Sequence, residues 1–207
     1  MTHPGRTVIA AVGVALVLPA LTSSPASADP PPAGVTVEVA SVTGNGCPAW
    51  TVRAEISDAR DRIALVYGQF AAQVGGISSP RDARKNCQVL LKVNVPRAYT
   101  YAIRAVDYTG LVQMEPGVTG TLRSQYHFRG PPVPPLPSRS VSGPYSEEFY
   151  FTETIDPAQL VYKPCGEERD FLAHDELRLD LGTSDPSKTS SWMHDQSTYH
   201  LAWKSCA

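Results

Sequence analysis

Residues 84–96 decide the fold: they read RKNCQVLLKVNVP and place a cysteine at the mouth of an alternating apolar run. In an extended chain, Val89, Leu91 and Val93 lie on one face. β-branched residues at a period of two favour a strand. Pro96 ends the run, because proline has no N–H to give to a neighbouring strand. The stretch therefore predicts a strand with one buried face.

The same alternation recurs along the chain, separated by turn-forming residues such as Asn45-Gly46. Nineteen prolines and fifteen glycines suit short strands and turns better than helices. We predict an all-β fold, an antiparallel β-sandwich of roughly nine strands. The clearest predicted strands are 35–40, 51–56, 99–106, 118–128, 147–155, 177–181 and 199–203.

One segment, residues 62–74, is ambiguous. Ile63, Val66, Tyr67 and Phe70 recur at helical spacing, whereas Ile63, Leu65 and Tyr67 recur at strand spacing. Periodicity alone slightly favours a helix. The surrounding β pattern favours a strand followed by a short loop, and both interpretations stay open at this point.

The first residues predict export. Arg6 precedes an apolar run at residues 8–21, and the small residues Ala26-Ser27-Ala28 suit a signal peptidase. The run is short for a membrane span, which needs about 20 apolar residues, although an uncleaved anchor is the alternative. We therefore expect a signal peptide at 1–28, a flexible lead at 29–34 and a single domain at 35–207, with a proline-rich loop at 130–144.

Charge limits the possible partners of the mature chain. Removing the leader takes away one arginine, so the net charge changes from −2 to −3. A chain so near neutrality has no strong electrostatic attraction for nucleic acid or anionic lipid. We expect no nucleic-acid partner and no membrane association after the leader is cleaved.

All four cysteines, Cys47, Cys87, Cys165 and Cys206, lie beyond the leader. An even number in an exported chain implies two disulfides, and four cysteines allow three pairings. We favour Cys47–Cys87 and Cys165–Cys206, because each joins neighbouring parts of the chain. Zinc binding is disfavoured, since no two cysteines are two to four residues apart.

The order of motifs resembles the secreted family known as domain of unknown function 4360 (DUF4360), which occurs in bacteria and fungi. The resemblance covers nearly the whole mature chain. It implies export and one domain, suggests that residues 62–67 form a strand, and brings no established activity or catalytic residue. The motifs are GNGCP at 44–48, RKNCQ at 84–88, VP at 95–96, VDYTG at 106–110, QYHFRG at 125–130, GP at 143–144, KPCG at 163–166 and YHLAWKSC at 199–206.

His174, Asp175 and Glu176 form the densest polar cluster, closely preceded by acidic residues at 167–170. Such groups can bind a cation or act as an acid and a base if they converge. A solvated acidic loop is the interpretation that we favour. A serine hydrolase is unsupported because no Gly-x-Ser-x-Gly motif occurs.

Aromatic residues on the predicted strands could form a stacking surface for sugars, although most should fill the core. Trp192, in a polar segment, is the one that we expect to be most exposed, and Tyr108 is a second candidate. Residues 134–140 could present Arg139 to a protease, but a proline-rich connector is the simpler interpretation.

We therefore expect a secreted, non-catalytic binding or structural module, with polysaccharide or cell-wall material as its ligand. A hydrolase using acidic residues near His174 and a protease inhibitor are the alternatives. The sequence predicts no metal or other cofactor, and oligomeric state is left open.

Overall fold

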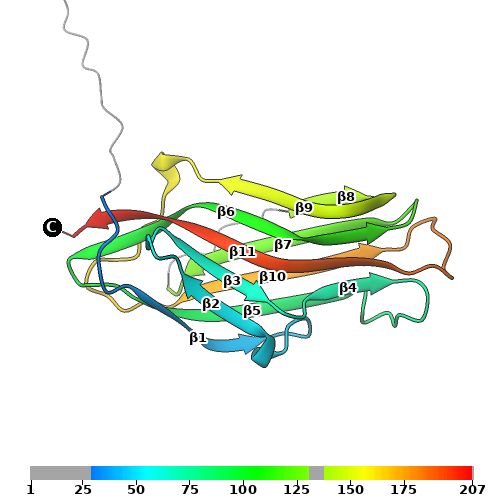
Figure 1. Cartoon of the computed structure of the whole chain (residues 1–207), viewed down its shortest axis with the longest axis horizontal. Coiled ribbons are helices and arrows are strands. Elements are labelled where there is room, and N and C mark those ends of the chain that lie inside the picture. Colours follow the sequence, from blue (N-terminus) through cyan, green and yellow to red (C-terminus); the bar gives the residue numbers. More distant parts are fainter. Residues whose placement is uncertain (1–28, 131–137, 207) are drawn as a thin grey trace, which may run out of the picture.

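The computed structural model describes residues 29–130 and 138–206. Their strands form two antiparallel sheets packed face to face, and β11 passes in front of β10 in Figure 1. The first sheet, here the β5 sheet, contains in spatial order β1 (Thr36–Thr43), β5 (Arg84–Asn94), β10 (Phe171–Asp180), β7 (Thr119–Phe128) and β8 (Ser138–Ser142). The second, here the β11 sheet, contains β2 (Val52–Ile56), β3 (Arg62–Tyr67), β11 (Ser190–Ser205), β6 (Tyr99–Met114) and β9 (Tyr145–Thr154), with β4 (Ala71–Val74) also paired to β11.

The all-β sandwich is thus confirmed, with eleven strands in the described residues and two single-turn 3-10 helices, η1 (Ala49–Thr51) and η2 (Pro157–Gln159). None of the helices in these residues is long and apolar enough to cross a membrane.

Residues 84–94, the alternating run with Cys87 at its start, form β5, which lies between β1 and β10. Cys87, Val89 and Leu91 are completely buried, and Gln88 and Lys92 on the other face are exposed. Alternation of this kind is what a strand shows when one face packs on a core and the other faces water. The core lies between the two sheets and takes side chains from both.

Both disulfides have the predicted pairing. Cys47 joins Cys87 at a Cα–Cα distance of 5.4 Å, and Cys165 joins Cys206 at 5.8 Å. The first ties the turn after β1 to β5, and the second ties the segment before β10 to the end of β11. Two disulfides fit the oxidising environment of an exported protein.

The ambiguous residues 62–74 form two strands, so the strand interpretation is correct. β3 pairs with β2 on one side and β11 on the other, which buries Ile63, Leu65 and Tyr67. Pairing on both sides outweighs the helical spacing, because periodicity alone cannot separate a short buried strand from a helix.

The predicted end of a strand at residues 107–110 is wrong, because β6 continues to Met114. β6 pairs with β11 along almost all of its length. Gly110 allows the two strands to approach closely: a Cβ there would lie 2.7 Å from the Phe149 ring and would also meet the carbonyl of Met193.

Two other predicted irregular segments are partly ordered. β8 lies within the predicted proline-rich loop and pairs with β7, whereas residues 131–137 lie outside the described residues. The lead at 29–34 begins with a fixed residue: the Asp29 N–H donates to Trp203, and its carboxylate accepts from the Ser205 N–H at 2.6 Å. The predicted leader, residues 1–28, also lies outside the described residues.

Candidate functional site

Trp192 and Tyr108, the two aromatic residues named as binding candidates, are buried, which corrects that prediction, whereas Trp50 is 77% exposed. Trp192 has no exposed surface, because β11 begins at Ser190 and turns this ring into the core, 5.3 Å from the Phe149 ring. Tyr108 is 2% exposed on the inner face of β6. Neither ring can stack on a ligand in this structure.

The predicted acidic loop around His174 is also wrong, because His174, Asp175 and Glu176 lie within β10. Asp175 points into the core and is completely buried. Glu176 is paired with Arg84, whose Nε donates to its carboxylate at 2.8 Å. The strand therefore turns Asp175 into the core and leaves His174 and Glu176 on the opposite face of β10.

Asp175 is the centre of a buried polar network that joins the two sheets. Its carboxylate accepts hydrogen bonds from Tyr67 at 2.6 Å, from Ser197 at 3.2 Å and from Ser124. His194 Nε2 lies 2.9 Å from Ser197 Oγ and 3.7 Å from the carboxylate. Asp175 and Ser124 belong to the β5 sheet, and the other three residues belong to the β11 sheet.

The network determines the protonation of its members. Burial alone would raise the pKa of Asp175, but hydrogen bonds and charge from His194, with hydrogen bonds from Ser124 and Tyr67, hold that pKa below its ordinary value. Burial and the neighbouring carboxylate raise the pKa of Tyr67. The carboxylate is thus ionised and the phenol is its donor.

Serine, histidine and aspartate also make up hydrolase triads, but the geometry here differs. In a triad the aspartate binds one imidazole nitrogen and the serine binds the other. Here Ser197 and Asp175 both lie on the Nε2 side of His194, and Nδ1 faces the Thr109 carbonyl at 3.1 Å. All three side chains have no exposed surface, so the network holds the sandwich together and presents no nucleophile to a substrate.

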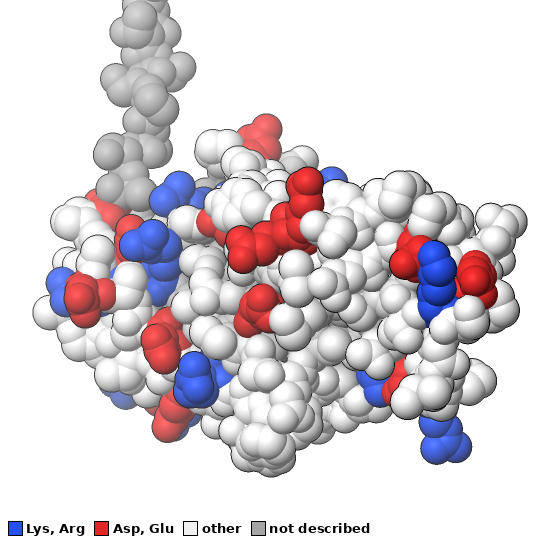
Figure 2. All heavy atoms as spheres, turned by 45° about the vertical axis from the view of Figure 1, so that its right-hand side comes forward, with Lys and Arg blue, Asp and Glu red and all other residues white. Residues whose placement is uncertain are grey.

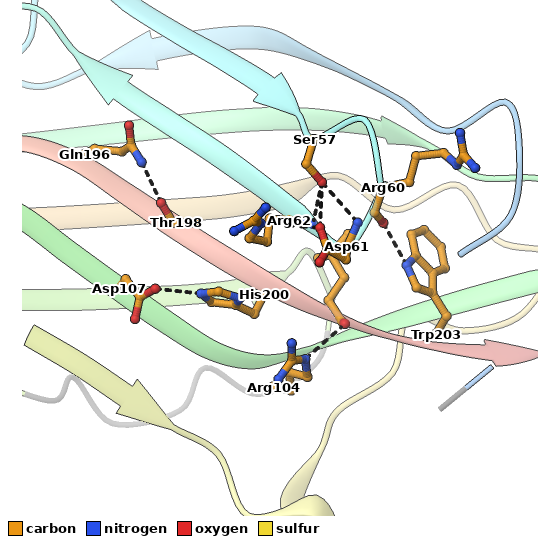
Figure 3. A network of polar contacts seen from close by, with 11 residues as sticks. Ser57, Arg60, Asp61, Arg62, Arg104, Asp107, Gln196, Thr198, His200 and Trp203 are labelled. Carbon is orange, nitrogen blue, oxygen red and sulfur yellow. Dashed lines mark hydrogen bonds and ion pairs between the residues drawn. The ribbon is translucent and has the colours of Figure 1, made fainter. Parts of the chain in front are cut away.

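The outer face of the β11 sheet carries a second polar network, part of which is drawn in Figure 3. His200 on β11 contacts Asp107 on β6 at 2.6 Å, with 19% and 16% of their side chains exposed. Thr152 on β9 donates to the same carboxylate at 2.8 Å. Nearby, Gln196 donates to Thr198 at 2.7 Å.

Tyr150 on β9 lies on this same face, and 64% of it is exposed. It pairs in register with Thr109, and its side chain also hydrogen-bonds Asp107. Burial opposes ionisation of Asp107, but hydrogen bonds from His200, Thr152 and Tyr150 lower its pKa below the ordinary value.

Two arginines border this network. Arg62 on β3 is the register partner of His200, and its side chain is 51% exposed. Arg104 on β6 is exposed and donates from Nε to the Leu201 carbonyl at 3.3 Å. We call Arg62, Arg104, Asp107, Tyr150, Thr152 and His200 the open-face cluster.

Charge over the molecule is mixed. Most of the face turned to the viewer in Figure 2 is uncharged, and acidic and basic side chains form small groups on it. This agrees with the small net charge of the chain.

A cavity of about 110 Å³ lies between the end of β5 and residues 163–170. Lys163 is 7% exposed, and its ammonium donates to the Glu167 carbonyl at 2.5 Å. Burial lowers the pKa of this lysine. Because Lys163 also binds the Pro164 carbonyl, its position is explained by the loop that contains Cys165. Over the described parts of the chain, His, Cys, Asp and Glu do not gather in threes suited to a metal.

The open-face cluster was not predicted as a site from the sequence. A signal for it exists in residues 198–203, where Thr198 and His200 alternate with Tyr199 and Leu201. That alternation places the two polar side chains on the outer face once the strand is recognised. Nothing in the sequence indicates that β3, β6 and β9 bring their polar residues to the same place.

The family whose description is "Domain of unknown function (DUF4360)" matches residues 33–206, and the chain belongs to it. The resemblance found in the sequence is therefore confirmed. A relative from Arthroderma benhamiae, described as an uncharacterized secreted protein, is 28% identical over 180 residues, which are 82% of this chain and 72% of that protein. Secretion, predicted from the leader, agrees with that description and with the two disulfides.

Among solved structures, the enzymatically active domain of bacteriophage CBA120 tailspike protein 4 matches 84% of this chain and 20% of its own, at 9% identity and a TM-score of 0.23. This chain thus spans about a fifth of that structure. A likeness at this level carries no argument about fold or function.

Proposed function

We propose that this secreted protein is a non-catalytic polysaccharide-binding module whose ligand lies along the outer face of the β11 sheet. The observation that carries the proposal is Tyr150, a 64% exposed ring on β9, the strand next to the one that bears Asp107 of the Asp107–His200 pair. An exposed aromatic ring next to hydrogen-bonding side chains suits a sugar, which has one apolar face and several hydroxyls.

The open-face cluster is also preorganised. Asp107 is fixed by His200, Thr152 and Tyr150, so these side chains lose little freedom when a ligand arrives. Groups held in place before binding reduce its entropic cost. An extended sheet face suits a polymer better than a small molecule.

The hydrolase alternative has less support. Asp175 is sealed in the core, and Glu176 is already paired with Arg84. The inhibitor alternative relied on Arg139 in a presented loop. Arg139 instead lies in β8, where it pairs with Leu122 of β7. The geometry therefore favours binding on the open face over either alternative.

The proposal is tested by depletion of the protein from solution onto a panel of insoluble polysaccharides. We expect Tyr150→Ala to weaken retention about tenfold, since a stacked aromatic contributes about 1 kcal/mol beyond its buried area. Trp50→Ala is the matched control, because Trp50 is 77% exposed but lies in η1, away from the cluster. Equal binding by wild type and Tyr150→Ala, or retention on none of the panel, would refute the proposal.

The same panel separates binding from hydrolysis. We expect no release of soluble reducing sugars by the wild-type protein. Release that is abolished by Glu176→Gln would make the protein an enzyme and the binding proposal wrong.

A further inference from the structure

We infer that the ligand of the open face is an acidic polysaccharide whose carboxylates bind to Arg104 and Arg62. This inference rests on the proposed function and names the class of sugar that the face selects. It follows from which hydrogen-bonding groups of the cluster are already occupied and which still face solvent.

The acceptors of the cluster are occupied. The Asp107 carboxylate accepts from His200 and Thr152 and also bonds with Tyr150. The neighbouring Asp61 carboxylate accepts from Ser57 Oγ at 2.7 Å and lies 3.3 Å from Arg62 Nε. A sugar hydroxyl that needs an acceptor has little to bind here.

The donors of the cluster are available. Arg104 uses Nε on the Leu201 carbonyl, and Arg62 uses Nε on Asp61. Within residues 29–130 and 138–206, the terminal amino groups of both arginines have no hydrogen-bond partner. Figure 3 shows Arg62 and Arg104 on either side of the β11 strand, with Arg104 held at its Nε by a main-chain carbonyl.

A guanidinium with free terminal N–H groups matches a planar carboxylate in two parallel hydrogen bonds. The spacing suits a polymer. Arg62 and Arg104 lie on β3 and β6 with β11 between them, so their strands are about 10 Å apart. That distance is comparable to the length of a disaccharide, so one chain crossing the strands can offer acidic units to both arginines.

The net charge, −2 for the whole sequence and −3 without the predicted leader, makes recognition local. The protein as a whole does not attract a polyanion, so binding depends on the two guanidiniums and not on a general field. A neutral polymer with the same backbone therefore lacks the contacts that Arg104 and Arg62 offer.

The test compares polygalacturonate with the same polymer after methyl esterification, which removes the charge and leaves the backbone unchanged. We expect the wild-type protein to bind polygalacturonate at least about tenfold more tightly, because a hydrogen bond to a charged group is strong enough to give that ratio. Arg104→Gln should remove most of this preference, because it should weaken binding to polygalacturonate more than binding to the ester.

Arg53→Gln is the matched control, since Arg53 is a 70% exposed arginine on β2 of the same sheet, and its ion pair is with Glu55. It should bind like the wild type. Arg62→Gln repeats the test at the second guanidinium, and the wild-type comparison needs no variant at all.

The outcomes separate the two proposals. Equal binding of the acid and the ester, or loss of the preference in Arg53→Gln but not in Arg104→Gln, would overturn the inference and leave polysaccharide binding standing. Tighter binding of dextran sulfate than of polygalacturonate would also overturn it, because the site would then select sulfate. Binding to no polysaccharide would remove the proposed function itself.

Discussion

Replacing Asp175 by asparagine tests the buried network with almost no change in shape. The carboxylate accepts from three hydroxyls and lies 3.7 Å from His194. Removing one member of a buried charged network typically costs about 3–5 kcal/mol, because its partners stay buried without a match. A domain of this size is stable by about 5–15 kcal/mol, so we expect Asp175→Asn to lose a large share of its free energy of unfolding.

The assay is urea unfolding followed by fluorescence, with both disulfides oxidised. Trp192 and Trp203 are buried and report loss of the core. We expect a loss of about 4 kcal/mol in the free energy of unfolding, or roughly 8–16 °C in Tm. Tyr67→Phe removes one donor and should lose about 1.5–3 kcal/mol. The double variant should lose less than the sum of the two, because the residues share a hydrogen bond.

Asp185→Asn is the control, since this exposed carboxylate bonds only within its own turn. A loss below about 1 kcal/mol in Asp175→Asn would contradict the stabilising role of the network. Strict additivity with Tyr67→Phe would contradict energetic coupling between Asp175 and Tyr67.

The pH dependence of the free energy of unfolding gives an independent test of whether Asp175 is ionised in the folded protein. The pKa of Asp175 is lowered in the folded protein, against about 3.9 in the unfolded chain. Its contribution is therefore complete above the unfolded value and is lost as the pH falls through the folded value. The stability difference between wild type and Asp175→Asn should be constant from neutrality to about pH 5 and shrink below about pH 4. A difference that grows on acidification would mean that the folded carboxyl is neutral.

Two further predictions concern stability. Replacing Cys47 and Cys87 together by alanine opens a loop of 40 residues. It should lower the free energy of unfolding, measured in urea, by about 4 kcal/mol. An unchanged midpoint would show that this disulfide does not contribute to stability. Gly120→Ala places a Cβ 2.6 Å from the Trp192 ring and 2.8 Å from Leu179 and should lower the free energy by about 1–3 kcal/mol through overpacking, measured by thermal unfolding; wild-type stability would show that Trp192 can shift.

Much of the fold follows from the sequence, because period-two alternation and export constrain it strongly. β5 was predictable from its valines, and the disulfides from the positions of four cysteines in an exported chain. Asp175 was predicted in a solvated loop and its burial was not predicted, although it lies in phase with Leu177 and Leu179 on β10. A charge in phase with leucines suggests the end of a strand, since burying it is costly unless partners are present. Those partners come from distant strands and leave no local signal.

The burial of Trp192 was not predicted for another reason. Trp192 and His194 face inward at even positions, whereas Ser197 and Tyr199 face inward at odd ones. The change of phase occurs at a bulge, where the pairing of β11 with β6 skips Asp195. An extra residue on one strand reverses the faces of those that follow, so the inner face cannot be continued through it from alternation alone.

The bulge also connects the two polar networks. Without it, His194 and His200 would share a face, because they are an even number of residues apart. With it, His194 joins Asp175 inside the sandwich, and His200 joins Asp107 outside. The inner network fixes β11 against the β5 sheet, and a fixed strand holds Thr198 and His200 in place on the outer face. Since a preorganised surface loses less entropy on binding, the buried carboxylate would support the binding that we propose for the open face without touching the ligand.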